Sequence, residues 1–331
     1  MIIRRVFYEP AALGYPLGAS LRKRYGELPW TAIESHNNIP ALRAEPNEAF
    51  GKLKQNLIIG VRKTHRYVEN HKISDFLVPY TSSGCGAMCL YCYLVCNYNT
   101  CSYLRVFVNR EDMMDRLVRH SLRAGRSMVY EVGSNSDLIL ENTVTRNLPW
   151  TIEEFARRGK GKITFPTKFA DVAPLLALRH QGKTIFRMSV NPDPVIRGTE
   201  FGTAPLADRI SAVNQMAGAG YPVGLLIAPV IFAAGWREQY LALLDQLQSS
   251  LSPAVRKNAT FEVIFMTYSY IHRAINQAAF PNAVDLFDPA AMTGRGRGKY
   301  WYRAALRQEG EVFFRRELSR RFPDANLVYV V

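Results

Sequence analysis

Five cysteines, all that the 331-residue chain contains, are confined to the stretch SSGCGAMCLYCYLVCNYNTC, residues 82–101. Cys85, Cys89 and Cys92 have the spacing C-x3-C-x2-C in a glycine-containing loop. Three thiolates in such a loop can bind three irons of a 4Fe-4S cluster and leave the fourth iron open for another ligand. Zinc with Cys96 as fourth ligand is the alternative, but the paired C-x2-C knuckles of a structural zinc site are absent. The spacing therefore favours an iron-sulfur cluster.

Two further cysteines, Cys96 and Cys101, follow this triplet. If a helix begins at Cys92, Cys96 lies on the same helical face, with Cβ atoms about 5–6 Å apart. The intervening NYNT favours a turn that leads Cys101 away from the three motif cysteines, so Cys101 is a weaker candidate than Cys96 for a thiol beside them. Burial as a small apolar side chain is the alternative for Cys96. A Cys96–Cys101 disulfide is a minor alternative, because an odd number of clustered cysteines in a reducing compartment argues against a disulfide framework.

Strands that alternate with helices must position this loop. Apolar, β-branched or aromatic runs predict strands over 76–80, 127–133, 162–167, 184–190, 221–231 and 261–269, with a further strand at 103–109. Helical periodicity predicts helices over 111–125, 205–220 and 236–250. Six βα units predict an α/β fold with a partial (β/α)6 barrel, in which functional groups lie at the C-terminal ends of the strands.

The flanking segments differ from this pattern. We expect residues 1–70 to form an irregular N-terminal extension packed on the barrel, 71–275 the barrel, and 276–331 a basic C-terminal appendage that contacts DNA, unless all three form one continuous domain. Lys and Arg exceed Asp and Glu by 42 to 28, a net charge of +14, which favours a polyanionic partner. With no secretory leader and no run of eighteen apolar residues, the chain is expected to be cytoplasmic, without a membrane segment.

The cysteine motif resembles that of the radical S-adenosylmethionine superfamily, and the whole chain resembles the spore photoproduct lyase family within it. The matching stretches are SSGCGAMCLYCYL, YLRVFVN, YEVGSNSD, FPTKF, RMSVNPDPVI and GRGRGKYWY, with YEPAALGYPLG and IGVRK nearer the start. This resemblance implies a DNA-repair lyase that reverts 5-thyminyl-5,6-dihydrothymine, the spore photoproduct, to two thymines. It implies a 4Fe-4S cluster and S-adenosylmethionine as cofactors, and a 5′-deoxyadenosyl radical that abstracts hydrogen from C6 of the lesion.

The same resemblance suggests partners and cofactor contacts. UV-damaged DNA is the expected substrate, a flavodoxin or ferredoxin the expected electron donor, and a monomer the expected state. Ser136, Asp137, Lys168 and Ser189 match the family's S-adenosylmethionine contacts, and each follows or ends a predicted strand, where functional residues are expected. A lysine can pair with the methionine carboxylate, while hydroxyls and a carboxylate can bond the cofactor's other polar groups.

One position departs from the family. Where YEVGSNSD carries Ser134, the family has a cysteine that gives a hydrogen atom to the thymine radical. An alcohol O–H is far harder to break homolytically than a thiol S–H, so Cys96 becomes the candidate donor. The family also suggests a tyrosine relay from the thiyl radical back to 5′-deoxyadenosine. Tyr93 is the stronger candidate, and packing against the loop is the favoured interpretation of Tyr91.

The segment GRGRGKYWYR interleaves cations with glycine and then aromatic residues. Arg295, Arg297 and Lys299 can contact phosphates, while Tyr300 and its neighbours wedge into a base step. Such contacts suit repair of a dinucleotide that must be turned out of the stack. The basic stretch at 313–323 is more simply a solvated helix face.

Two other functions fit these residues. The chain could be a radical S-adenosylmethionine enzyme with a different nucleic-acid substrate or outcome, because Ser134 removes the usual donor. Alternatively, it could be a non-catalytic nucleic-acid-binding module with a structural metal, which the set of cofactor residues at strand ends disfavours.

Overall fold

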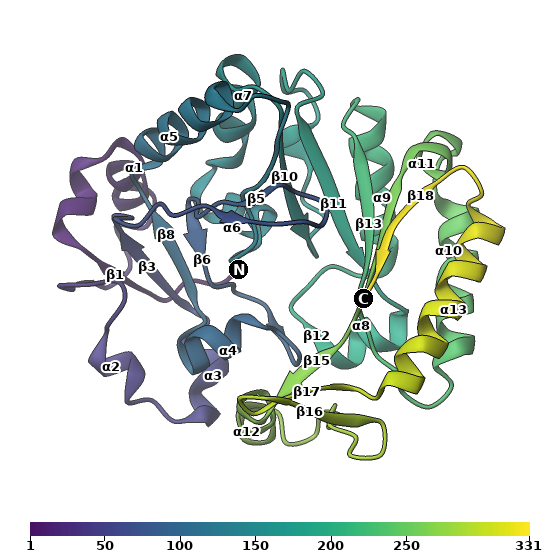
Figure 1. The fold of residues 1–331 in the computed structure, drawn as a ribbon. Helices are drawn as coiled ribbons and strands as arrows, with labels where there is room; N and C mark the ends of the chain where they lie inside the picture. The colour runs from purple at the N-terminus through teal and green to yellow at the C-terminus, as the bar shows by residue number, and fades with distance from the viewer. The chain divides into compact units, whose positions relative to one another are not determined.

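The computed structural model describes residues 1–331, which fold into two compact units. The first unit comprises residues 1–88, 93–165 and 177–184, and the second comprises residues 89–92, 166–176 and 185–331. Figure 1 traces the chain from the N-terminus to the C-terminus. None of the helices combines the length and apolarity needed to cross a bilayer.

A five-stranded sheet forms one part of the first unit. Its strands are β1 (Arg5–Tyr8), β2 (Trp30–Ala32), β3 (Asn56–Gly60), β6 (Ser82–Ser83) and β8 (Leu104–Phe107), in the order β2-β1-β3-β8-β6. Neighbours are parallel except β6 and β8. Val6, Leu57 and Val106 share an apolar core with helix α1 (Pro16–Arg24).

The expectation of irregular structure over residues 1–70 is therefore wrong. This segment supplies three strands of a parallel sheet, and every residue of β3 is buried. Its strands are only three to five residues long, so no sustained period marks them in the sequence. The strand expected at 103–109 is β8, and it completes this sheet.

Barrel strands and their helices form the rest of the first unit. Strands β5 (Phe76–Leu77), β9 (Val129–Glu131) and β10 (Lys162–Thr167) are parallel in that order, and β4 (Val68–Glu69) joins β5 antiparallel. The helices are α5 (Arg110–Arg123), α6 (Leu138–Thr145) and α7 (Leu148–Arg158). Helix α5 buries Met113, Met114 and Leu117 on one face, as its 3.6-residue period predicts.

A second parallel sheet is the core of the second unit. Its strands are β11 (Thr184–Val190), β13 (Val223–Val230), β14 (Thr260–Phe265) and β18 (Asn326–Val330), in the order β11-β13-β14-β18. The helices are α9 (Leu206–Gly218), α10 (Trp236–Ser250) and α13 (Ala304–Arg321). Helices α10 and α13 lie side by side (Figure 1).

A small antiparallel sheet completes this unit. Strand β17 (Lys299–Tyr302) lies between β15 (Thr267–Ser269) and β16 (Met292–Gly296), and helix α12 (Tyr270–Ala279) follows β15 directly. Shorter elements of the chain are η1 (Pro10–Gly14), α2 (Pro40–Arg43), η2 (Asn47–Ala49), α3 (Phe50–Leu53), β7 (Met88–Cys89), α4 (Leu94–Tyr98), η3 (Asn99–Cys101), η4 (Ala173–Leu175), α8 (Asp193–Thr199), β12 (Glu200–Phe201) and α11 (Pro253–Asn258).

All six predicted barrel strands are present. Strands β10 and β11 have the predicted bounds, and β13 lies within the predicted run. Strand β5 is shorter than predicted, and the run 261–269 divides at Met266 into β14 and β15. The division matters for the site, because β15 leaves the parallel sheet to pair with β17.

Candidate active site

The first motif cysteine, Cys85, is buried in the first unit. The Ala87 backbone N–H donates to Cys85 Sγ over 3.4 Å. Lys54, itself only 3% exposed, donates from Nζ to the Cys85 carbonyl at 3.0 Å and to the Ser102 carbonyl at 2.8 Å. A backbone N–H directed at sulfur favours the thiolate and tunes an iron-sulfur cluster. These surroundings suit a cluster ligand.

Gly84 brings this cysteine beside one of the predicted cofactor residues. Gly84 has a φ of +78° and forms an isolated parallel bridge with Ser136. A Cβ at Gly84 would lie 1.9 Å from the Tyr103 carbonyl oxygen, so only glycine fits this crossing. The loop that enters the cysteine motif and the loop after β9 are therefore held together within the first unit.

The hydroxyl of Ser136 is buried and has no hydrogen-bond partner. An unsatisfied buried hydroxyl is unfavourable, so it suits a position that a polar ligand completes. Asp137 is the N-cap of α6, and its Oδ1 accepts hydrogen bonds from the N–H groups of Ile139 and Leu140, each at 3.1 Å. Ser134 lies in the preceding turn and is half-buried.

The segment Cys89–Cys92 belongs to the second unit, where side chains of α12 hold its backbone. Asn276 donates from Nδ2 to the Leu90 carbonyl at 2.8 Å, and His272 Nε2 lies 2.9 Å from the Cys92 carbonyl oxygen. The Cys92 N–H donates to the Cys89 carbonyl at 3.1 Å and closes a turn between these two cysteines.

His272 has a defined tautomer in this position. A carbonyl oxygen only accepts, so Nε2 must carry the proton that it donates to Cys92. Burial lowers the pKa of His272, which favours the neutral ring. Nδ1 then accepts from the Ser269 hydroxyl, 2.8 Å away. His272 and Ser269 are each only 2% exposed.

No three His, Cys, Asp or Glu side chains converge closely enough to hold a single metal ion. The thiolates of a 4Fe-4S cluster bind different irons, so they need not converge on one point. The residues fit the cluster in their chemistry: Cys85 and Cys89 are buried, Cys92 is half-buried, and no cysteine is in a disulfide.

The geometry expected for Cys96 is only partly present. Helix α4 begins at Leu94 with Tyr93 as its N-cap, so Cys92 precedes the helix and does not share a face with Cys96. The Cys96 N–H donates to the Tyr93 carbonyl at 3.0 Å, which places both on the first helical turn. The Tyr93 side chain is 51% exposed.

Cys101 is a core residue, and the turn predicted for NYNT before it is instead the end of α4 followed by the short helix η3. It is buried in an apolar cluster with Leu42, Ile58 and Tyr103. Its Sγ lies 3.9 Å from the Leu42 carbonyl oxygen. The fold explains Cys101 by packing.

Tyr91 is buried within a charged network of the second unit. Its hydroxyl donates to Glu200 in a short hydrogen bond, and Glu200 also accepts from Arg209 Nη2 at 2.6 Å and Asn191 Nδ2 at 2.9 Å. Burial alone would raise the pKa of Glu200, but the charges of Lys168 and Arg209 and these hydrogen bonds lower it to about 2. Burial, with the Glu200 charge, raises the pKa of Tyr91.

Lys168 and Ser189, two predicted cofactor residues, are in direct contact. Lys168 Nζ lies 2.5 Å from Ser189 Oγ, 2.8 Å from the Ala228 carbonyl oxygen and 3.4 Å from Glu200. Lys168 ends β10 and Ser189 lies near the end of β11, so both occupy the carboxyl ends of strands, as predicted.

The predicted DNA-contacting segment is a β-hairpin made of β16 and β17, residues 292–302, which we call the basic hairpin. Its tip needs left-handed backbone at Gly296, Arg297 and Gly298, with φ of +86°, +52° and +66°, which explains the glycines. Arg295, Arg297 and Lys299 are exposed.

Aromatic residues of the hairpin pack against neighbouring side chains. Arg295 lies over the Trp301 ring at 4.6 Å, and Tyr300 contacts Phe287 edge-on with centroids 4.7 Å apart. The arginines of α13, by contrast, pair with nearby carboxylates: Arg315 with Glu311 and Arg316 with Glu317. The interpretation of this helix as a solvated face agrees with these pairs.

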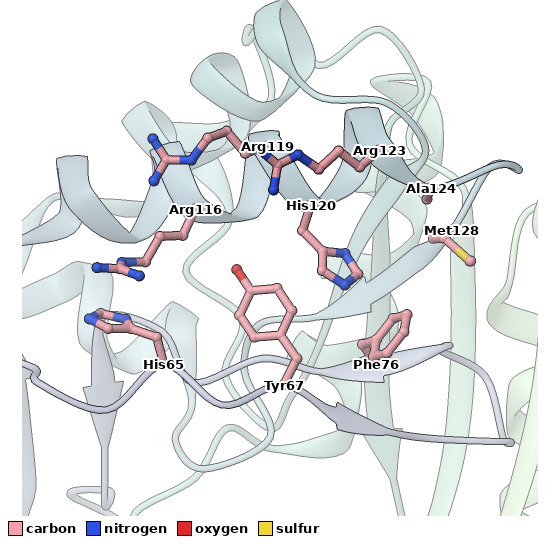
Figure 2. Close-up of a pocket in the computed structure, with 9 residues that line it drawn as sticks. All are labelled: His65, Tyr67, Phe76, Arg116, Arg119, His120, Arg123, Ala124 and Met128. Carbon is pink, nitrogen blue, oxygen red and sulfur yellow. The ribbon is translucent and has the colours of Figure 1, made fainter.

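A second basic surface lies on α5. A cavity of about 610 Å3 is lined by Arg116, Arg119 and Arg123 over His65 and Tyr67 (Figure 2). It lies at the amino-terminal ends of β5 and β9, beside Phe76 and Met128. Two of the predicted cofactor residues, Ser136 and Asp137, follow the carboxyl end of β9, so this cavity is at the opposite end of that strand.

Three buried polar residues, Lys54, Glu200 and His272, and half-buried Asn276 were not predicted from the sequence. Each holds a part of the cysteine motif through a hydrogen bond. None belongs to a periodic pattern or a recognisable spacing, so no signal in the sequence marks them.

Comparison with known proteins identifies the class. Solved structures of spore photoproduct lyase match with a TM-score of 0.92 at 30% identity, covering 100% of this chain and 99% of theirs. One is a double mutant with bound AdoMet and dinucleoside spore photoproduct, and another, at 29% identity and the same TM-score, is complexed with dinucleoside spore photoproduct. The match confirms the predicted α/β fold class, a partial barrel of the radical S-adenosylmethionine type.

The family follows from the sequence comparisons. The spore photoproduct lyase family model matches residues 1–331. Spore photoproduct lyase of Bacillus subtilis is 33% identical over 98% of this chain and 97% of its own length, and that of Clostridium acetobutylicum is 28% identical over 100% and 99%. This chain belongs to the spore photoproduct lyase family.

Proposed function

We propose that this protein is a DNA-repair lyase that reverts the spore photoproduct to two thymines. The observation that carries the proposal is the match over the whole chain to lyases whose structures hold the dinucleoside lesion. UV-damaged DNA is then the substrate, and the cytoplasm, where DNA and reduced electron carriers are present, is the place of action. A flavodoxin or ferredoxin supplies the electron, and the enzyme works as a monomer.

Cofactor binding is assigned to seven residues. Cys85, Cys89 and Cys92 hold a 4Fe-4S cluster, while Ser136, Asp137, Lys168 and Ser189 hold S-adenosylmethionine. Two observations support this: the N–H donor to Cys85 Sγ and the buried hydroxyl of Ser136 that lacks a partner. When bound, these cofactors supply a 5′-deoxyadenosyl radical that abstracts hydrogen from C6 of the lesion.

Cys96 is our candidate for returning a hydrogen atom to the thymine radical. The transfer breaks the Cys96 S–H bond and leaves a thiyl radical, to which Tyr93 gives the hydrogen atom of its hydroxyl; Tyr93 then recovers a hydrogen atom from 5′-deoxyadenosine. Half-buried Cys96 and exposed Tyr93 share the first turn of α4, which supports this order. Tyr91 is the second relay candidate, but its bond to buried Glu200 favours a packing role.

DNA contact is assigned to the C-terminal appendage, residues 276–331. Within it, Arg295, Arg297 and Lys299 contact phosphates, and Tyr300 belongs to the aromatic edge next to them. The exposure of these cations supports the assignment, because exposed cations are available to phosphates.

A repair assay tests this function. Reduced, reconstituted enzyme and S-adenosylmethionine are incubated with an oligonucleotide that carries the lesion, and thymine recovery is measured. We expect repair by the unmodified enzyme, loss of clean recovery in Cys96→Ala, and full recovery in Cys101→Ala. An intact lesion with the unmodified enzyme would overturn the lyase assignment. Full thymine recovery with Cys96→Ala would leave the lyase assignment standing and overturn only the assignment of Cys96 as hydrogen donor.

Ser134 favours a second candidate, a related radical enzyme with a different outcome. Without a thiol at this position, the thymine radical could be quenched in another way and give a modified product. Mass analysis of the same reaction separates the two candidates: consumption of the lesion without two thymines supports the second.

A further inference from the structure

Helix α12 lies between the basic hairpin and the Cys89–Cys92 segment, and it contacts both. At one end, β15 pairs with β17 so that Tyr268 is opposite Tyr300 and Ser269 is opposite Lys299. The Tyr270 N–H also donates to the Gly298 carbonyl at 3.2 Å. The hairpin tip is therefore in direct backbone contact with the start of α12.

From the first two turns of α12, one face of the helix holds the cysteine segment. His272 and Asn276 are four residues apart, so they lie on the same face. They donate to the carbonyls of Cys92 and Leu90 at 2.9 and 2.8 Å. These are hydrogen bonds to the peptides that carry the motif, and a shift of the Cys92 carbonyl necessarily moves the peptide that positions its thiol.

Side-chain contacts join the β15 residues that pair with the hairpin to the α12 residues that hold the cysteine segment. These contacts leave the side chains little freedom to move. The Ser269 hydroxyl bonds His272 Nδ1 at 2.8 Å, and Asn276 Nδ2 lies 2.9 Å from the Tyr268 hydroxyl. The Tyr268 and His272 rings stack with centroids 5.2 Å apart. Of the β15 residues that pair with the hairpin, Tyr268 thus contacts both His272 and Asn276, and Ser269 contacts His272.

We propose that His272 and Asn276 couple the basic hairpin to the Cys89–Cys92 segment, so that DNA bound at the hairpin changes how tightly S-adenosylmethionine binds. Both are positioning residues, because they act through Cys92 and Leu90. The inference rests on the proposed function, since it needs a cluster at the cysteines and DNA at the hairpin. Coupling between two ligands is reciprocal, so S-adenosylmethionine must change DNA affinity by the same factor.

Binding measurements test this coupling without turnover. The reconstituted full chain is titrated with S-adenosylmethionine, and the spectrum of the reduced cluster is followed by electron paramagnetic resonance, with and without a saturating undamaged DNA duplex. We expect the duplex to change the dissociation constant about fivefold or more in the unmodified protein, within the usual range of coupling. In the double variant His272→Ala/Asn276→Ala, the change falls below twofold while each ligand still binds alone.

Two variants separate coupling from simple structural support. His272→Gln keeps an N–H donor for the Cys92 carbonyl, so it restores at least part of the coupling. Gln277→Ala, on the exposed side of the same helix, retains it fully. If the double variant fails to fold, Asn276→Ala alone, at a half-buried position, must still reduce the coupling.

Three results would decide against the inference. Equal duplex effects in the unmodified and double-variant proteins would overturn it, as would full coupling in Asn276→Ala. It also fails if the unmodified protein binds both ligands and the duplex changes nothing. If that protein forms no cluster or binds no DNA, the proposed function itself fails, and the inference falls with it.

Discussion

Single buried polar residues fix the backbone of the cysteine motif. Lys54 holds the carbonyl of Cys85, and His272 holds that of Cys92. Each donor is almost fully buried, and each satisfies a backbone carbonyl of the motif. Thiol spacing predicts the cofactor, and these donors hold the peptides from which the thiols project.

Ser136 offers a direct test of the cofactor assignment. Replacing it with alanine removes a buried hydroxyl that has no partner, so we expect the free energy of unfolding to stay the same or rise by about 1 kcal/mol. Affinity for S-adenosylmethionine should fall roughly three- to tenfold, the value of one hydrogen bond. Calorimetric titration and denaturant unfolding measure the two effects. Unchanged affinity would remove Ser136 from the cofactor site.

Glu200 controls the acid stability of the second unit. Its folded pKa of about 2 lies below the ordinary value of 4.5, so its stabilisation is present above pH 4.5 and is lost as the pH falls toward 2. Glu200→Gln leaves Lys168 and Arg209 without their carboxylate, and should cost roughly 3–5 kcal/mol at pH 7.

Unfolding by urea at several pH values measures this effect. The difference in the free energy of unfolding between the unmodified protein and Glu200→Gln should become smaller below pH 4.5. Glu238→Gln, at an exposed position, serves as the control and should match the unmodified protein. If the difference in the free energy of unfolding stays constant down to pH 2, Glu200 does not have the lowered pKa assigned to it.

At the level of elements, the basic hairpin and α5 present similar charges in different settings. The hairpin displays its cations on a glycine tip whose left-handed backbone holds Arg297 outward from the sheet. On α5, Arg116 and Arg119 lie over the aromatic side of a cavity at the far end of the strands (Figure 2). Because the hairpin and α5 carry similar positive charge in different places, two arginines can be removed from each and the effects compared.

Arg295→Ala/Arg297→Ala should weaken DNA binding more than Arg116→Ala/Arg119→Ala. Each lost phosphate contact costs about five- to tenfold at roughly 0.1 M salt, so we expect at least a tenfold loss for the hairpin pair and less than about threefold for the α5 pair. Fluorescence anisotropy with a labelled duplex, repeated at two salt concentrations, measures both. Equal losses would mean that overall charge, rather than the hairpin, sets the affinity.

For the whole molecule, the sequence predicts what is long or regularly spaced. The runs at 162–167 and 184–190 are rich in apolar and β-branched residues, as is expected of parallel strands that are buried on both faces, and their bounds agree with β10 and β11. The five-residue strand β3 is stabilised by pairing with β8 across more than forty residues of chain. No local pattern predicts such pairing.

In the candidate active site, too, local patterns could be predicted from the sequence and long-range contacts could not. The spacing of Cys85, Cys89 and Cys92 is local, so it could be recognised without a structure. Glu200 and His272 acquire their partners only when distant segments fold together: Glu200 meets Tyr91 and His272 meets Cys92 across more than a hundred residues. Their chemistry depends on burial that only the tertiary structure creates.

The surroundings of Lys168 also have a consequence for ligand selectivity. Its ammonium group faces three oxygen atoms, those of Ser189, Ala228 and Glu200, which match its three N–H donors. The carboxylate of a ligand such as S-adenosylmethionine must displace one of these oxygen atoms from Lys168. Only a negatively charged oxygen compensates for the hydrogen bond that is lost. The site should therefore reject an analogue that lacks the amino-acid carboxylate far more strongly than one altered elsewhere.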